Sequence, residues 1–286
     1  MENKYVCSVD IGGTKIATAI MEYPADGSVP HPVFEAEVPT EAQEGGEAVF
    51  QRIEASIKAA LEANPDVEVL GVGIGAAGVV DPKTGAIAYA NEIMPGWSGV
   101  QLGPRLREDL GLPVAVVGDV QAHALGEAHW GVGKGKFSVL CLGIGTGIGG
   151  AYVENGRVTQ GFHGAAGHMG HIECSAAAGI PCACGRSGHL ESVASGTSIG
   201  RMYDERFGRV DPSRPSVGRD VNDLCRAGDA KATEVIHDAG FALGASLGSL
   251  ANILDPEVIV LSGGVIHQGP DSVSYTHLTL PTKLEV

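Results

Sequence analysis

The sequence has little of several things that would each indicate a particular class of protein. Aromatic residues make up only 5% of its 286 residues, and it has no run of about 18 apolar residues such as a transmembrane helix needs. Basic residues are scarce too: 19 Lys and Arg stand against 34 Asp and Glu, for a formal net charge of −15. Because an acidic chain repels nucleic acids and anionic membranes, we expect neither as a partner. The N-terminal residues show no secretory signal, so we expect a cytoplasmic protein.

Cysteine is also sparse, and its spacing does not suggest a disulfide framework. The six cysteines are Cys7, Cys141, Cys174, Cys182, Cys184 and Cys225. Three of them crowd between residues 174 and 184, which in a cytoplasmic protein favours metal binding over disulfide bonding. Glycine, by contrast, is abundant at 43 residues. This is about twice the usual share, so a glycine pair needs supporting context before it indicates a site.

Predicted strands and helices alternate along the chain, which indicates an α/β fold. Two units of strand, glycine-rich turn and strand, near residues 10 and 145, suggest two similar halves that face one another across a cleft. We expect an N-terminal α/β lobe over residues 1–120 and a C-terminal α/β lobe over 121–270. The Gly- and Ala-rich composition of the chain stops at residues 272–286, and these residues look like a translated adapter sequence. We therefore expect a non-native tail that replaces the natural C-terminus.

The motif DIGGTK follows the first predicted strand and has the composition of a phosphate-binding turn. Its glycines would let backbone N–H groups approach a phosphate, its threonine would add a hydroxyl donor and its lysine a positive charge. The aspartate at the strand end is placed to hold Mg²⁺ through water. The alternative is an ordinary hairpin turn. The candidate residues are Asp10, Gly12, Gly13, Thr14 and Lys15.

Two further glycine-rich turns are candidates for nucleotide binding. GIGTGIGG leads into a predicted strand, so it is neither a Walker motif nor a Rossmann turn. LSGG follows the last predicted strand, and we expect it near an adenosine. The candidate residues are Gly145, Thr146, Gly147, Gly149, Gly263 and Gly264.

Asp119 lies between a predicted buried strand and a predicted helix. A carboxylate there could accept a proton from a substrate hydroxyl during phosphoryl transfer. The alternative is a plain helix N-cap, for which aspartate is well suited.

The stretch from residue 164 to 191 holds a set of possible metal ligands. Cys182 and Cys184, with His171 before them and His189 after them, form a Cys₂His₂ set that suits structural zinc. Cys174 is a possible substitute ligand. The alternative is a loop with free thiols.

Together these pieces resemble the ROK family (repressors, open reading frames and sugar kinases) of the actin-like ATPase and hexokinase superfamily. The resemblance spans about residues 4–268 and rests on these landmarks, in family order: DIGGTK, GVGIGAAGVVD, NEIMPGW, the Asp119 segment, GTGIGG, GHMGH, CACGRSGHLE, ASG and LSGGV. It implies a two-lobed actin-like ATPase (ribonuclease H-like) fold with a nucleotide and sugar cleft between the lobes. It also implies ATP and Mg²⁺ as cofactors, structural Zn²⁺, and a homodimer.

The resemblance assigns roles to individual residues. Asp119 matches the catalytic base that activates the sugar 6-hydroxyl, and Cys182 and Cys184 match zinc ligands. The fourth family ligand is usually Cys, where this chain has His189. The positions that match sugar-binding residues are Gly78, Asn91, His168, His171 and Glu191, of which His171 is also a zinc ligand.

Departures from the glucokinase-like pattern bear on the substrate. Gln121 replaces an asparagine, and His168 replaces a glutamate that would clasp two sugar hydroxyls. Both substitutions are similar to those in N-acetylmannosamine kinases, so we expect phosphorylation of the 6-hydroxyl of N-acetylmannosamine. Gly118 departs from both patterns. The alternatives are a glucokinase or an N-acetylglucosamine kinase, then a non-catalytic sugar-binding protein or a repressor.

Overall fold

The computed structural model describes residues 2–90 and 94–266. It divides into two compact units, the first made of residues 1–126 and 159–166 and the second of 127–158 and 167–286. The division falls inside a helix at Gly126 rather than at residue 120, and a short later segment returns to the first unit. Asn91 and the expected non-native tail lie outside the described residues.

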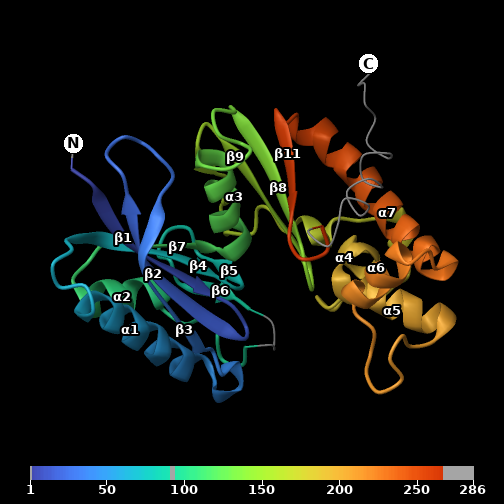
Figure 1. Ribbon diagram of the computed structural model, residues 1–286, viewed down its shortest axis with the longest axis horizontal. Helices are drawn as coiled ribbons and strands as arrows, with labels where there is room; N and C mark the ends of the chain where they lie inside the picture. Colours follow the sequence, from blue (N-terminus) through green and yellow to red (C-terminus); the bar gives the residue numbers. More distant parts are fainter. Residues whose placement is uncertain (1, 91–93, 267–286) are drawn as a thin grey trace. The chain divides into compact units, whose positions relative to one another are not determined.

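The first unit is built on a five-stranded sheet in the order β3-β2-β1-β4-β7 (Figure 1). Its strands are β1 (Lys4–Ile11), β2 (Lys15–Tyr23), β3 (His31–Pro39), β4 (Val69–Ala76) and β7 (Val114–Gly118), with a small separate pair β5 (Val79–Val80) and β6 (Ile87–Tyr89). Its helices are α1 (Gly46–Glu62), α2 (Leu102–Leu110) and α3 (Asp119–His129), with a 3-10 turn η1 (Ala42–Glu44). Strands β1, β2 and β3 form an antiparallel meander, and β4 and β7 run parallel to β1.

The second unit repeats this order with a four-stranded sheet, β10-β9-β8-β11. Its strands are β8 (Ser138–Ile144), β9 (Ile148–Glu154), β10 (Arg157–Val158) and β11 (Val258–Ser262). Its helices are α4 (Glu191–Ala194), α5 (Gly196–Phe207), α6 (Gly218–Arg226) and α7 (Ala230–Leu254), with 3-10 turns η2 (Met169–His171) and η3 (Ser175–Ala177). Strands β8, β9 and β10 are antiparallel, and β11 is parallel to β8. In each unit, therefore, a strand pairs in parallel with the first strand of a hairpin that has a glycine-rich turn.

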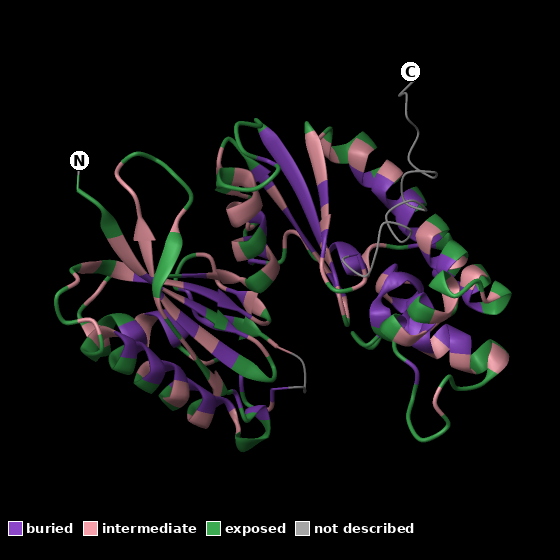
Figure 2. Ribbon diagram, in the orientation of Figure 1, coloured by how far each residue is buried: buried purple, intermediate pink, exposed green. Residues whose placement is uncertain are grey.

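Each unit has its own hydrophobic core, visible as buried ribbon in Figure 2. In the first unit, α1 buries one face, including Phe50 and Ile53, against the sheet. In the second unit, α5, α6 and α7 pack against one another and share a core with β8, which is buried along almost its whole length. These separate cores account for the two compact units, because apolar burial is the main favourable term in folding.

Local sequence signals explain two of the helix boundaries. Helix α2 ends at Gly111, which takes a left-handed φ of 65° that glycine adopts at little cost. Helix α7 begins after Asp229, whose side chain accepts a hydrogen bond from the Ala232 N–H. Strand β7 was expected to be buried, but it lies at the edge of the sheet order and Ala115 is exposed.

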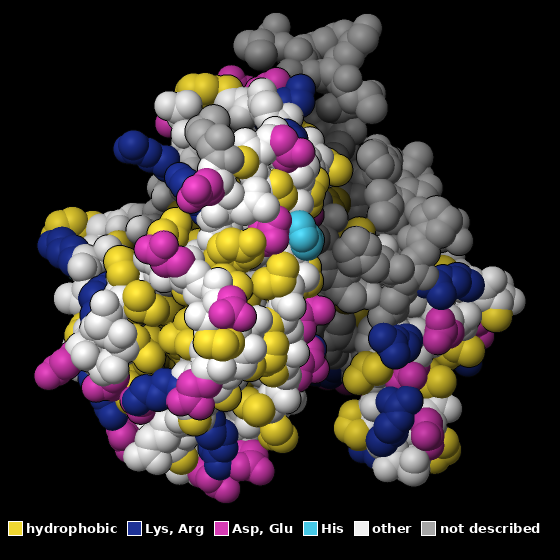
Figure 3. Space-filling model, turned by 60° about the vertical axis from the view of Figure 1, so that its left-hand side comes forward, with side chains coloured by type: hydrophobic (Ala, Val, Ile, Leu, Met, Phe, Trp, Pro, Cys, Tyr) yellow, Lys and Arg dark blue, Asp and Glu magenta, His cyan; other side chains and the backbone are white. Residues whose placement is uncertain are grey.

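The surface is mixed in charge, and Figure 3 shows acidic and basic side chains interspersed on one face. Among the described residues, none of the helices combines the length and apolar character that a membrane span requires.

Candidate functional site

In the first unit, two carboxylates lie at the ends of parallel strands. Asp10 is the penultimate residue of β1, and Asp119 directly follows β7 as the first residue of α3. Strand β4 runs between them, and its Gly75 pairs with Asp10 on one side and with Val117 on the other. A Cβ atom on Gly75 would lie 3.9 Å from the Asp10 Oδ1 and 3.6 Å from the Asp119 Cα. The two carboxylate-bearing positions are therefore one strand apart, across a residue with no side chain.

The Asp10 and Asp119 carboxylates have different surroundings. Desolvation raises the pKa of the Asp10 carboxyl, and the nearby Lys15 ammonium works in the opposite direction. The exposed Asp119 side chain accepts a hydrogen bond of 2.8 Å from the Val120 N–H through its Oδ1. A helix N-terminus stabilises negative charge at that position. Asp119 is thus a solvent-accessible carboxylate on a rigid element.

The DIGGTK turn is closed by its own hydrogen bonds and by one residue that the sequence analysis missed. The Gly12 N–H donates to the Lys15 carbonyl over 3.0 Å, as in a hairpin turn. The fully buried Thr40 donates its hydroxyl to the Gly12 carbonyl over 2.7 Å. Lys15 forms an exposed ion pair with Glu37 of β3. Because solvent screens such a pair, an incoming anion can compete for the lysine.

In the second unit, the glycine-rich segments gather at one end of the β8–β11 pair. The Gly145 N–H donates to the Gly147 carbonyl over 2.9 Å and closes the β8–β9 turn. The Gly196 N–H donates to the Gly145 carbonyl over 2.8 Å, so the start of α5 touches the same turn. Gly263 has φ of 94°, and a Cβ atom there would lie 2.4 Å from the Ile144 carbonyl oxygen. Close backbone approach explains why positions 196 and 263 are glycine.

Glu191 fastens this turn to the loop that precedes α4. Its Oε2 accepts a hydrogen bond of 2.9 Å from the Ile148 N–H, and its Oε1 lies 3.9 Å from the Cys182 Sγ. A Cβ atom on Gly147 would lie only 2.6 Å from the Oε2. The absence of a side chain at Gly147 therefore leaves room for the carboxylate. Nothing in the local sequence indicates this bond, since its partners are 43 residues apart.

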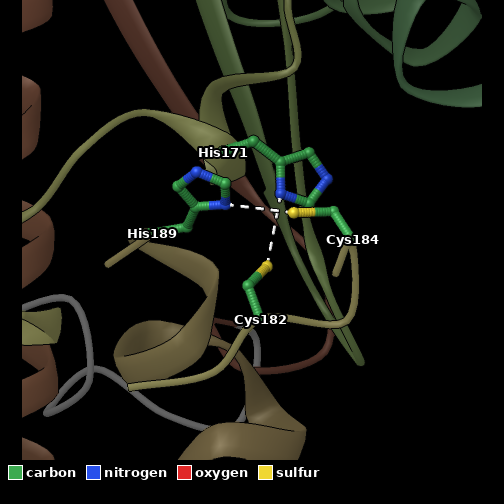
Figure 4. Close-up of side chains that lie close together, drawn as sticks. All are labelled: His171, Cys182, Cys184 and His189. Carbon is green, nitrogen blue, oxygen red and sulfur yellow. Dashed lines mark hydrogen bonds between the residues drawn. The ribbon is translucent and has the colours of Figure 1, made fainter. Parts of the chain in front are cut away.

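The four candidate metal ligands come together in the second unit, and their side chains point toward one another in Figure 4. Their ligand atoms all lie within 4.8 Å of one another. The Cys182 Sγ is 3.6 Å from the His171 Nδ1, and the Cys184 Sγ is 3.3 Å from the His189 Nδ1. Zinc bonds of about 2.3 Å to sulfur and 2.0–2.1 Å to nitrogen, at tetrahedral angles, put sulfur and nitrogen about 3.5 Å apart. The side-chain geometry therefore fits a tetrahedral ion without a large rearrangement.

The loop that carries the ligands folds as a narrow hairpin. The Cys182 N–H donates to the Arg186 carbonyl over 2.7 Å, and Gly185 and Gly188 take φ values of 87° and 85°. Burial lowers the pKa of His171, which favours the neutral imidazole that a metal requires. Cys174 is 8% exposed and lies in the hydrophobic core, outside the ligand set.

The remaining predicted sugar-binding and nucleotide-binding residues lie in turns and loops or close to them. Gly78 lies in the turn between β4 and β5 with φ of 102°, and a Cβ atom there would lie 2.7 Å from the Tyr89 carbonyl oxygen. His168 is exposed, and its ring stacks on that of His171 at 6.2 Å between centroids. Thr146 is exposed at the tip of the β8–β9 turn, and Gly149 and Gly264 flank the glycine-rich segments.

The Gln121 side chain connects two backbone segments by hydrogen bonds. Its side chain is 7% exposed, accepts a hydrogen bond of 3.1 Å from the Gly118 N–H and donates one of 3.3 Å to the Ala166 carbonyl. Both bonds lie within the first unit, and they fasten segment 159–166 to the end of β7. Gln121 therefore restrains the backbone at Gly118 and Ala166.

Comparison with known proteins identifies the family. The family model for the ROK family matches residues 6–275. A glucokinase from Halalkalibacterium halodurans is 35% identical over 280 residues, covering 94% of this chain and 83% of the relative.

Two solved structures are similar over nearly the whole chain. A ROK family glucokinase from Streptomyces griseus, in complex with glucose and AMPPNP, has a TM-score of 0.77 and 30% identity, covering 96% of this chain and 88% of its own. A Listeria monocytogenes protein proposed to be an N-acetylmannosamine kinase has a TM-score of 0.79 and 26% identity, covering 96% of this chain and 88% of its own. These matches confirm both the predicted resemblance and the predicted fold class. The chain belongs to the ROK family and has the α/β, actin-like ATPase fold of ROK sugar-kinase structures.

Proposed function

We propose that the protein is an ATP-dependent sugar kinase that transfers a phosphoryl group to the 6-hydroxyl of a hexose or hexosamine. The observation that carries this proposal is the pair of carboxylates, Asp10 and Asp119, set across Gly75 at the ends of parallel strands. Phosphoryl transfer needs positioned groups and charge neutralisation more than covalent chemistry. The glucokinase names of its relatives support the same reaction class.

Asp119 is the proposed general base. It receives the proton of the sugar 6-hydroxyl as the oxygen bonds to the phosphorus and the bond to ADP breaks. Exposure of its carboxylate and its fixed place at the start of α3 suit this role. Asp10 is the proposed Mg²⁺ residue, acting through water. When bound, Mg²⁺ neutralises phosphate charge.

The glycine-rich turns are the proposed contacts to ATP. The Gly12 and Gly145 N–H groups bond within their own turns, so the backbone N–H groups of residues 13–14 and 146–147 are the proposed donors for phosphates, with Lys15 adding charge. Gly263 and Gly264 are proposed to lie near the adenosine. The backbone hydrogen bonds of Gly145 and the close backbone packing at Gly263 support this assignment, because they restrain the second-unit turn.

Among sugars, we propose N-acetylmannosamine as the preferred substrate. Its 2-position carries an acetamide rather than a hydroxyl, and His168 offers an exposed imidazole where a glutamate would favour hydroxyl donors. Glu191, His171, Gly78 and Asn91 are the other proposed sugar-binding residues. Glucose is the second candidate, which the name of the 35% identical relative favours.

The ligand set of His171, Cys182, Cys184 and His189 is proposed to hold a structural zinc ion. Four soft ligands with matched nitrogen–sulfur separations favour a closed tetrahedral site. The ion would hold the loop that ends at Glu191, and through Glu191 it would steady the β8–β9 turn.

The proposed base is tested by Asp119→Asn. Loss of a general base lowers kcat about 10²- to 10⁴-fold, with a small change in the KM for ATP. Asp109→Asn is the matched control, because Asp109 is an exposed aspartate on α2 of the same unit. Equal kcat in the two variants, measured by coupled ADP release, would remove Asp119 from the mechanism.

A further inference from the structure

Thr40, the residue that follows β3, joins three parts of the first unit by hydrogen bonds. The residue is fully buried. Its hydroxyl donates to the Gly12 carbonyl over 2.7 Å, and its N–H donates to the Thr14 carbonyl over 3.0 Å. Its own carbonyl accepts a hydrogen bond of 3.2 Å from the Arg52 Nη1 of α1. One buried residue therefore holds two carbonyls of the DIGGTK turn and is itself held by a helix.

The bond from the Thr40 hydroxyl fixes the direction of a peptide group that is otherwise little restrained. The peptide group between Gly12 and Gly13 has no Cβ atom on either side, so steric contacts limit its rotation less than elsewhere in the turn. A trans peptide group is planar, and its carbonyl and N–H point in opposite directions. Because the Gly12 carbonyl points toward Thr40, the Gly13 N–H points away from Thr40.

We propose that Thr40 is a positioning residue for the phosphates of ATP: its hydroxyl holds the Gly12–Gly13 peptide group so that the Gly13 N–H faces the nucleotide. The inference rests on the proposed function and adds to it a residue that contacts the turn rather than the nucleotide. A donor that is already oriented binds a phosphate more tightly, because no free energy is used to order it on binding. Without the hydroxyl, the Gly12 carbonyl loses this donor and the peptide group is free to rotate.

The test is the affinity of Thr40→Val for MgAMPPNP, a non-hydrolysable analogue of MgATP, measured on the full chain by isothermal titration calorimetry. Valine is β-branched like threonine and lacks the hydroxyl, so the bond to the Gly12 carbonyl is removed while the Thr40 backbone bonds remain possible. We expect the Kd to rise about tenfold, which is about 1.4 kcal/mol and close to the contribution of one hydrogen bond to a charged group. Thr40→Ser keeps the hydroxyl and should restore the parent Kd.

Thr18→Val is the matched control, because it removes another buried threonine hydroxyl from the same unit. Thr18 is 1% exposed in β2, and its hydroxyl shares a hydrogen bond of 2.7 Å with the Ser56 hydroxyl of α1. The Tm of this variant should fall, as that of Thr40→Val does, because each loses a buried hydrogen bond. Its Kd for MgAMPPNP should match that of the parent, because the Thr18–Ser56 bond lies outside the DIGGTK turn.

Three results would each overturn the inference while leaving the proposed kinase standing: a parent-like Kd in Thr40→Val, an equal rise of Kd in Thr18→Val, or no recovery in Thr40→Ser. If Thr40→Val does not fold, Thr40→Ala leaves space for water beside the Gly12 carbonyl and should raise the same Kd. A folded parent chain that binds no MgAMPPNP would contradict the proposed function, and the inference with it.

Discussion

Gly147→Ala tests whether Glu191 holds the β8–β9 turn. The new Cβ atom would lie 2.6 Å from the Glu191 Oε2, about 0.8 Å closer than the 3.4 Å at which ordinary contact begins. The carboxylate must therefore move, and the hydrogen bond of 2.9 Å to the Ile148 N–H is broken. Ile148 is 4% exposed, so water does not readily replace the lost partner.

The expected cost follows from the type of bond. A hydrogen bond to a charged acceptor contributes about 1.5–3 kcal/mol. For a unit of this size, that corresponds to a fall in Tm of about 3–12 °C. Because the same turn is proposed to bind ATP phosphates, the KM for ATP should rise severalfold while the Asp119-dependent step keeps its pH profile.

Gly145→Ala is the matched control, since a Cβ atom on Gly145 in the same turn meets nothing within 4 Å. We expect its Tm to stay within about 2 °C of the parent, as for a substitution without a clash. Differential scanning calorimetry and ATP titration of both variants make the comparison. Equal Tm for the two alanine variants would refute the role given to Glu191.

Three further results are expected. His168→Glu should lower the preference for N-acetylmannosamine, measured as its kcat/KM divided by the kcat/KM for glucose, by about tenfold or more, since the new carboxylate favours hydroxyl donors. An unchanged ratio in steady-state assays would exclude His168 from the choice of substrate. Metal analysis should find about one zinc per chain and less in His189→Ala, whereas a fully active, metal-free parent would remove the zinc proposal. Burial raises the pKa of Cys7 to about 12 and of Cys141 to about 11, so in the native protein iodoacetamide should label neither thiol. Iodoacetamide should label the exposed Cys184 only when zinc is absent. Mass spectrometry that finds labelled Cys7 in the native protein would contradict its burial.

Much of the fold is predictable from the sequence because its signals are local. The hairpin around DIGGTK, the helix over 46–62 and the stop at Gly111 each follow from alternation, helical period or a left-handed glycine. The ligand set is also predictable, since all its members lie between residues 171 and 189 and sequence spacing limits how far apart they can lie. The sequence alone does not show that Cys174, the possible substitute ligand, packs in the hydrophobic core.

The contacts that sequence reasoning missed join residues that are distant in the chain. Thr40 holds the carbonyl of Gly12, 28 residues away, and Glu191 holds an amide 43 residues away. The Gln121 side chain bonds backbone groups of Gly118 and Ala166, and its effect on the choice of sugar stays a prediction. Such bonds depend on how strands and loops are placed against one another, and no periodicity or motif encodes that placement.

The central claim, sugar phosphorylation by this chain, is tested most directly by sugar-dependent ADP release from MgATP. N-acetylmannosamine, N-acetylglucosamine, glucose and mannose are compared, with the phosphorylated position assigned by NMR. The account predicts ADP release that depends on the sugar, highest kcat/KM with N-acetylmannosamine, and a product esterified at the 6-position. Preference for glucose would keep the kinase and refute the substrate assignment, and no sugar-dependent ADP release from folded protein would contradict the central claim.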